Sequence, residues 1–180
     1  KEKLSIFDCF SGSGVVARYL RQFADQLWVN DLERYSYIIN SCYQANKEEA
    51  DTQKLRSLHQ HLCQQLENQP LEPGFISKYY APVDDTNIQP GERCFYTTRN
   101  AKFLDTARKL IDQQVPSDLQ AYFLAPLISQ ASIHANTSGV FKGFYKNKEG
   151  IGQFGGTARD ALQRIAAPIT LPYPVFSNFS

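Results

Sequence analysis

The chain has 180 residues, 42% of them hydrophobic and 21% charged, which suits one folded domain, alone or with an attached lobe, and excludes a disordered chain. Nineteen Lys and Arg against eighteen Asp and Glu give a net charge of +1, so any nucleic-acid site must be a local patch. No run approaches the roughly eighteen apolar residues of a membrane span and no signal peptide opens the chain, so we expect a cytoplasmic protein.

The first part of the chain has the pattern of a parallel α/β unit. An apolar run at residues 4–10 predicts a buried strand that ends in a Gly/Ser turn. Apolar residues at helical spacing predict a helix over 14–24, and a second apolar run at 26–30 predicts a strand that leads into Asp31. A strand, a glycine turn, a helix and a strand in this order indicate the opening of a parallel sheet.

The middle of the chain is expected to be mainly helical. The expected segments are a helical region at 33–68, a loop at 70–90, a helix capped by Asn100 that runs to 114, a helix over 116–134, a loop at 136–157 and a short helix from 157 or 158 to 165. Residues 169–176 are predicted to form a third strand, which Pro172 and Pro174 make irregular.

The long gap between the second and third predicted strands indicates how the domain is organised. A plain βαβ connection needs far fewer residues, so the intervening segment is expected to form a lobe of its own. The predicted fold class is therefore α/β, with a core from residues 1–32 and 167–180 and a helical insertion at 33–166.

The glycine turn at residues 8–14 carries the most information about function. Gly12 and Gly14 allow a sharp turn from strand to helix and leave no side chain in the way of a ligand. The helix that follows points free N–H groups at such a ligand, and Asp31 at the end of the next strand suits the two hydroxyls of a ribose. Together these features predict a pocket for a cofactor that contains a nucleoside.

Two cofactor classes fit this turn. Residues 12–17 also match the GxGxxA pattern of dinucleotide sites, so an NAD(P)-dependent oxidoreductase is one interpretation. Asp8 favours another, because a carboxylate at the mouth of the turn repels a pyrophosphate and attracts the ammonium and sulfonium groups of S-adenosylmethionine. We expect S-adenosylmethionine.

A local basic and aromatic segment lies at residues 139–164. It holds five basic and two acidic side chains, with aromatic residues and glycines between them. Lysines neutralise phosphates and aromatic rings stack on bases, so the segment suits nucleic acid. A solvated loop whose aromatic residues cover the core explains the same composition.

The other reactive side chains are interpreted as structural. His134 lies at a helix end, where a capping or packing role is expected, and Asp84 and Asp85 suit a turn. No metal site is expected, because no CxxC pair occurs among the four cysteines, which are Cys9, Cys42, Cys63 and Cys94. We expect these thiols to be reduced.

Several motifs resemble one enzyme family. The Asp-x-Phe-x-Gly-x-Gly of residues 8–14 is similar to the cofactor motif of Rossmann-like methyltransferases. Residues 132–146 and 150–156, with 75–80 and 91–97, resemble the N-terminal part of adenine-specific DNA methyltransferases from restriction–modification systems. The resemblance implies a partial Rossmann-like methyltransferase sheet, with methyl transfer from S-adenosylmethionine to the amino group of an adenine that is flipped out of double-stranded DNA.

The resemblance also implies site residues and partners. The cofactor residues would be Asp8, Phe10, Gly12 and Gly14 for the methionine part, Asp31 for the ribose and Leu32 for the adenine. The DNA-binding residues, in the inserted lobe, would be Lys142, Tyr145, Lys146, Lys148 and Arg159. Besides DNA, it implies a cognate restriction endonuclease in the same system, with no direct contact.

One family feature is missing from the sequence. The catalytic motif of these enzymes is (Asp/Asn)-Pro-Pro-(Tyr/Phe), and the nearest match, at residues 171–174, lacks the acid and the paired prolines. No catalytic residue is therefore assigned, and we expect the chain alone not to methylate DNA. A non-catalytic DNA-binding fragment is a further alternative.

Overall fold

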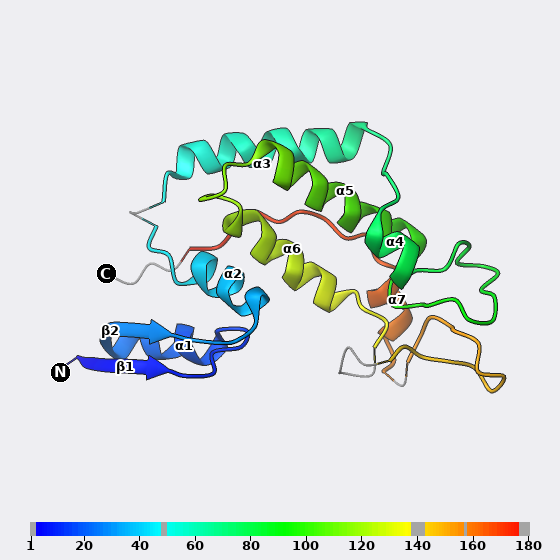
Figure 1. Ribbon diagram of the computed structural model, residues 1–180, viewed down its shortest axis with the longest axis horizontal. Coiled ribbons are helices and arrows are strands. Elements are labelled where there is room, and N and C mark those ends of the chain that lie inside the picture. The colour runs from blue at the N-terminus through cyan, green and yellow to red at the C-terminus, as the bar shows by residue number, and fades with distance from the viewer. Residues whose placement is uncertain (1–2, 48–49, 138–142, 157, 177–180) are drawn as a thin grey trace.

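The computed structural model of the protein describes residues 3–47, 50–137, 143–156 and 158–176. It is a mixed α/β structure, in which a small α/β unit joins a larger helical lobe. Figure 1 shows the unit at one end of the molecule and the lobe beside it. Within the described ranges, no helix combines the length and the apolar character that crossing a membrane requires.

The α/β unit confirms the predicted order of strand, turn, helix and strand, but the first strand is not buried as predicted, because Leu4 and Phe7 are 57% and 60% exposed. It consists of β1 (Leu4–Asp8), α1 (Val15–Leu20), a single 3-10 turn (Arg21–Phe23) and β2 (Ala24–Val29). The strands pair in parallel and form the only sheet in the described residues. Because α1 returns the chain to the start of β2, both strands end at the same edge, with Asp8 paired to Val29. The glycine turn and the segment around Asp31 are therefore neighbours.

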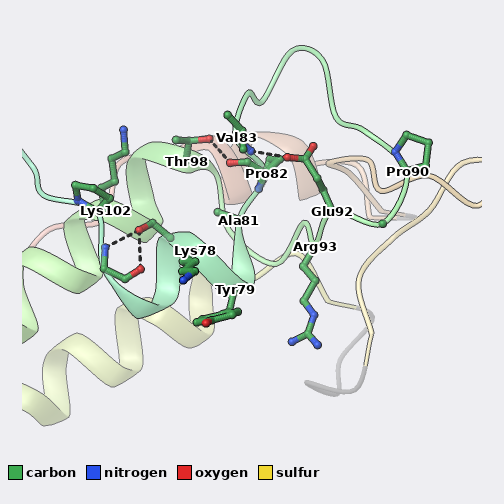
Figure 2. A pocket seen from close by; sticks show the side chains of 14 residues that line it. Lys78, Tyr79, Ala81, Pro82, Val83, Pro90, Glu92, Arg93, Thr98 and Lys102 are labelled. Atoms are coloured by element: carbon green, nitrogen blue, oxygen red, sulfur yellow. Dashed lines mark hydrogen bonds between the residues drawn. The ribbon is translucent and has the colours of Figure 1, made fainter.

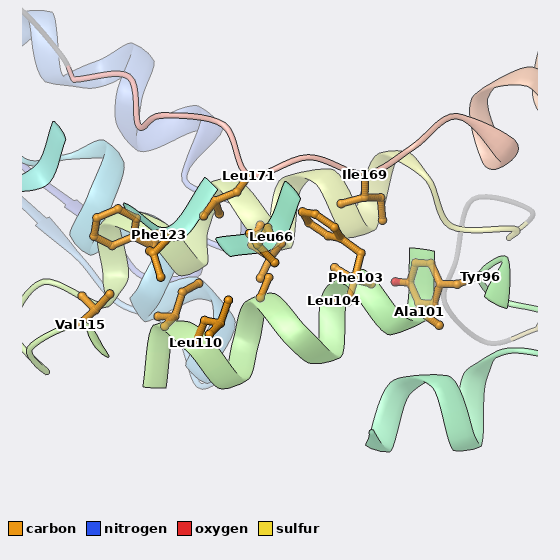
Figure 3. Packing of buried hydrophobic residues seen from close by; sticks show 14 of the residues in the cluster. Leu66, Tyr96, Ala101, Phe103, Leu104, Leu110, Val115, Phe123, Ile169 and Leu171 are labelled. Atoms are coloured by element: carbon orange, nitrogen blue, oxygen red, sulfur yellow. The ribbon is translucent and has the colours of Figure 1, made fainter. Parts of the chain in front are cut away.

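The helical lobe holds most of the apolar core. Its helices in the described residues are α2 (Arg34–Tyr43), α3 (Thr52–Asn68), α4 (Phe75–Tyr80), α5 (Thr98–Gln114), α6 (Ala121–Ile133) and α7 (Ala161–Ala166). Apolar side chains at helical spacing turn inward between α3, α5 and α6. Figure 3 shows Phe103 and Leu110 of α5 in this cluster with Phe123 of α6. The large core thus belongs to the helices rather than to the sheet.

Helix α2 connects the α/β unit to the lobe. It follows β2 after a short turn, and its buried residues Ile39 and Cys42 pack with Ala125 of α6 in a second, smaller cluster. Burial raises the pKa of the Cys42 thiol to about 12, so this side chain is neutral and acts as an apolar group in the contact.

The predicted third strand at residues 169–176 is wrong. These residues form no strand, and Ile169 and Leu171 are buried in the helical core. Figure 1 shows this segment, in red, running along the helices and outside the sheet that β1 and β2 form. Pro172 and Pro174 cannot donate to a sheet ladder, and Ile169 and Leu171 instead pack in the apolar cluster of the helices.

Other boundaries also differ from the prediction. The helical region at 33–68 is two helices, and α4 lies inside the predicted loop at 70–90. Asn100 does not cap α5, because Thr97 occupies the N-cap and accepts a hydrogen bond from the Asn100 amide. The buried side chain of Asn100 instead donates to the carbonyl oxygens of Ile165 and Ala167.

Candidate functional site

The glycine turn has the sharp geometry that its sequence predicts. Gly12 and Gly14 have φ angles of 50° and 71°, in the left-handed region that glycine adopts without steric cost. The Gly14 amide donates to the Ser11 carbonyl oxygen at 2.7 Å, and the Ser11 amide donates to the Asn30 carbonyl oxygen at 2.9 Å. The turn is thus held both within itself and to the residue that follows β2.

Asp31 links this turn to the segment after β2. Its Oδ2 accepts a hydrogen bond from the Gly12 amide at 2.8 Å, and its Oδ1 accepts one from the Glu33 amide at 2.9 Å. These bonds, the Glu33 bond first, hold the pKa of the Asp31 carboxyl below its ordinary value of 3.8. The structure thus brings together two predicted site residues, Gly12 and Asp31, and keeps the carboxylate ionised at neutral pH.

The two glycines have different surroundings. A side-chain carbon added to Gly12 would meet nothing within 4 Å, whereas one added to Gly14 would overlap with Oδ1 of Asn40. Gly12 therefore leaves space on the open side of the turn. The space at Gly14, which the sequence analysis assigned to a ligand, is occupied by a side chain of the protein.

The remaining predicted cofactor residues lie at the rim of the turn. Asp8 is half-buried at the end of β1, where its carboxylate oxygen accepts a hydrogen bond from the Phe10 amide at 3.4 Å. Phe10 and Leu32 are 90% and 96% exposed, so their side chains are free to pack on an added molecule. The structure places all three at the shared edge of the two strands.

A buried group beneath the turn was missed by the sequence analysis. It consists of Ser11, Ser36 and Asn40, which we call the polar bracket. The Asn40 side-chain amide donates to Ser11 Oγ at 3.1 Å and to Ser36 Oγ at 3.2 Å, and the two hydroxyls lie 3.2 Å apart. In the sequence, the only sign of this group is the polar Asn40 among the apolar residues of α2. The sequence does not show that Asn40 contacts Ser11, and the fold does.

Three of the predicted DNA-binding residues, Tyr145, Lys146 and Lys148, lie on a hairpin rather than in an irregular loop. Lys146 and Gly152 form an antiparallel bridge, and the Gln153 amide donates to the Tyr145 carbonyl oxygen at 3.0 Å. Lys146 and Lys148 are exposed near the tip of this hairpin, and the Tyr145 ring packs near Gly156. Arg159 is exposed just before α7. Lys142, predicted with them, lies outside the described residues.

A buried asparagine holds the base of the hairpin. The Asn136 side-chain amide donates to the carbonyl oxygens of Cys94 at 2.7 Å and of Gln153 at 2.9 Å. Burial raises the pKa of the neighbouring Cys94 thiol to about 12. Asn136 is fully buried, and its bonds join the hairpin to the segment at Cys94. His134 is structural as predicted, because its Nδ1 bonds the Arg164 carbonyl oxygen.

A cavity with basic lining residues lies in the lobe, away from the glycine turn. It measures about 1050 Å³ between α4 and the loop at 82–93, and its cationic lining residues are Lys78, Arg93 and Lys102. Figure 2 shows Glu92 turned toward the Val83 amide, which donates to it at 2.9 Å. The second oxygen of Glu92 accepts from the Gln89 amide at 2.7 Å. This carboxylate thus shapes the loop.

Three curated relatives resemble the chain over most of its length. It is 30% identical over 145 residues to the type II methyltransferase M.NlaIII of Neisseria lactamica, which is 78% of this chain and 40% of that protein. It is 28% identical over 142 residues to the type II methyltransferase M.CviAII of Paramecium bursaria Chlorella virus 1, which is 77% of this chain and 40% of that protein. The modification methylase StsI of Streptococcus sanguinis is 28% identical over 149 residues, which is 78% of this chain and 22% of that protein.

The likeness covers only part of each relative. The chain spans 40% or less of the length of each. No solved structure matches it.

A family model gives the same assignment as these relatives. The model describes the D12 class N6 adenine-specific DNA methyltransferases and matches residues 2–153, from β1 to the hairpin. This match confirms the resemblance seen in the motifs and gives no support to a dinucleotide-dependent oxidoreductase. Because this match covers most of the 180 residues, the chain belongs to the D12 class N6 adenine-specific DNA methyltransferase family.

Proposed function

We propose that this chain supplies the cofactor site and DNA contacts of a site-specific adenine DNA methyltransferase. The enzyme would transfer a methyl group from S-adenosylmethionine to the exocyclic amino group of an adenine that is flipped out of the duplex. The observation that carries this proposal is the family match over residues 2–153, which covers both the glycine turn and the hairpin. No described residue is assigned a role at the reacting atoms.

The residues at the shared strand edge fit S-adenosylmethionine. The space beside Gly12 is open, so the backbone of the turn is accessible to a ligand. Asp8 and Phe10 would hold the methionine part together with Gly12, since carboxylates attract its ammonium and sulfonium groups. S-adenosylmethionine supplies the methyl group when bound.

The other half of the cofactor would lie against the segment after β2. Each Asp31 oxygen already accepts one backbone hydrogen bond and has a lone pair left for a ribose hydroxyl. The exposed Leu32 side chain would pack on the adenine ring. Gly14 would contribute by shape, because Asn40 occupies the space beside it.

The hairpin would contact double-stranded DNA. Lys146, Lys148 and Arg159 are exposed, as a phosphate contact requires, and Tyr145 offers a ring for stacking. We place these contacts in the lobe at residues 33–166, together with Lys142. Because phosphate contacts carry no sequence information, the hairpin lysines would position the DNA rather than select the site.

The expected setting is a restriction–modification system in the cytoplasm. Two of the relatives are named type II methyltransferases and one a modification methylase. A methyltransferase of this kind would mark the sites that a cognate restriction endonuclease cuts, and the two proteins would meet on DNA without direct contact.

Calorimetric titration with S-adenosylmethionine tests the cofactor site. Binding of S-adenosylmethionine without binding of NADH is the expected result. Asp31→Ala should weaken the affinity about tenfold, because the turn loses the carboxylate bound to Gly12. Asp25→Ala, which removes an exposed carboxylate from β2, is the matched control and should bind as the unchanged chain does. If Asp31→Ala and the control bind S-adenosylmethionine with equal affinity, Asp31 is not part of the cofactor site.

The salt dependence of DNA binding tests the hairpin. Lys146→Ala and Lys148→Ala should each lower the slope of log affinity against log salt by about one, alike for all DNA sequences. Lys54→Ala, on the surface of α3, is the control for a general loss of positive charge. A slope that changes equally with Lys54→Ala would contradict a contact specific to the hairpin.

A further inference from the structure

Helix α2 carries a buried asparagine beneath the glycine turn. The Asn40 side chain is 4% exposed, and its amide nitrogen donates to Ser11 Oγ at 3.1 Å, to Ser36 Oγ at 3.2 Å and to the Ser36 carbonyl oxygen at 3.0 Å. Ser36 is fully buried and Ser11 is 8% exposed. One amide group thus joins the turn after β1 to the first turn of α2.

The oxygen of the same amide faces Gly14. Oδ1 of Asn40 is buried and has no hydrogen-bond partner in the described part of the chain. A side-chain carbon at Gly14 would overlap with this oxygen and would lie 3.1 Å from Cγ. Because its nitrogen donates to two serines, moving the Asn40 side chain aside would break these hydrogen bonds. The glycine at position 14 therefore makes room for Asn40.

These contacts fix the distance between two segments that form the cofactor site. Ser36 lies three residues after Glu33, in the first turn of α2, and its amide donates to the Glu33 carbonyl oxygen at 3.0 Å. Asp31 makes the second link, on the open side of the turn, through its bond to the Gly12 amide. The turn is thus held to the segment after β2 from both sides, by Asp31 at the surface and by Asn40 in the interior.

We propose that Asn40 is a positioning residue for the cofactor site. It touches no part of the proposed ligand, and instead holds the turn at 11–14 and the start of α2 in the geometry that the ligand needs. A site fixed before binding has less conformational freedom to lose, so its affinity is higher. The inference rests on the proposed function and extends it to a residue that has no place in the turn motif.

Calorimetric titration of variants of the chain with S-adenosylmethionine tests this role. Asn40→Ala should weaken binding roughly tenfold in protein that circular dichroism shows to be folded. Ile39→Ala is the matched control, because Ile39 is its neighbour on α2, is equally buried and packs against α6. The control should lower the melting temperature and leave the affinity of the folded protein unchanged.

A double-mutant cycle gives a second readout that simple loss of stability does not produce. Gly14→Ala should weaken binding strongly in the unchanged chain and much less when Asn40→Ala has removed the oxygen that it overlaps. If Asn40→Ala does not fold, Ser36→Ala takes its place, since it removes one acceptor of the bracket and should also reduce affinity.

The outcomes separate this inference from the proposed function. If the unchanged chain binds no S-adenosylmethionine, the proposed function fails and the role of Asn40 fails with it. If the unchanged chain binds and Asn40→Ala binds equally well, or Ile39→Ala loses as much affinity, only the positioning role is overturned. Additive effects of Gly14→Ala and Asn40→Ala would also overturn it.

Discussion

The ionised carboxylate of Asp31 holds the glycine turn to the segment after β2. Hydrogen bonds from Glu33 and Gly12 lower its pKa from 3.8, so the ionised form is favoured in the folded chain. A lowered pKa stabilises the folded state fully above the unfolded value, and this contribution is lost as the pH falls through the folded value. The stability difference between the unchanged chain and Asp31→Asn should therefore be constant above about pH 5 and shrink below about pH 4.

Urea unfolding at a series of pH values measures this difference. Asp25→Asn, on the exposed side of β2, controls for the removal of a charge. A difference that stays the same down to pH 2 would show that the carboxylate of Asp31 is not what holds the turn.

The two glycines of the turn should respond differently to substitution by alanine. Both have a positive φ, so each alanine costs about 1 kcal/mol for the left-handed backbone. Gly12→Ala meets open space and should cost little more, whereas Gly14→Ala pushes against Asn40 and should cost about 2–4 kcal/mol in total. Chemical unfolding measures the loss of unfolding free energy for both variants. Equal losses would show that the Asn40 side chain moves to make room for the alanine.

At the level of elements, local signals predicted the α/β unit well. The apolar runs, the glycines and the acid after β2 lie within a short stretch of sequence, and the same residues form the turn in the structure. Residues 169–176 have the composition of a strand, but their partners are helices that are distant in sequence, so the strand prediction was wrong. The polar bracket was missed for a similar reason, because Asn40 and Ser11 are 29 residues apart.

Helix α4 was missed because its stabilising group lies on another helix. Asp105 of α5 accepts hydrogen bonds from the amides of Gly74, Ile76 and Ser77, which are the free donors at the start of α4. The N-cap residue is Gly74, which has no side chain that could accept a hydrogen bond from the first turn, so the local sequence gives only a weak sign of a helix start. Rules that use only neighbouring residues in the sequence cannot predict a helix cap that another helix supplies.

This long-range cap should be important for α4. Asp105→Ala leaves the amides of Ile76 and Ser77 without an acceptor, whereas Gly74 keeps its bond to Ser77 Oγ, and should lower the unfolding free energy by roughly 2–3 kcal/mol, as measured in urea. Asp112→Ala is the matched control on the same helix, where an exposed i,i+4 pair with Arg108 predicts a loss of about 0.5 kcal/mol or less. Similar losses for the two variants would contradict the capping role.

The whole molecule is unevenly stabilised. The lobe has a large buried cluster, whereas the α/β unit leaves large apolar side chains in contact with water, among them Phe7 at 60% and Trp28 at 50% exposure. On α1, Val15, Val16 and Tyr19 are also exposed. Parallel sheets are normally covered on both faces, so these exposed side chains leave the unit with less buried apolar surface than the lobe.

This imbalance predicts that the α/β unit opens before the lobe. The chain contains one tryptophan, Trp28 of β2, so its fluorescence reports on the unit alone. Circular dichroism reports mainly on the helices of the lobe, which make up most of the regular structure described. The fluorescence transition should have the lower midpoint on heating, and amides of β1 and β2 should exchange with solvent faster than those of α5. Coincident transitions would instead show that the contact of α2 with α6 joins both parts into one cooperative unit.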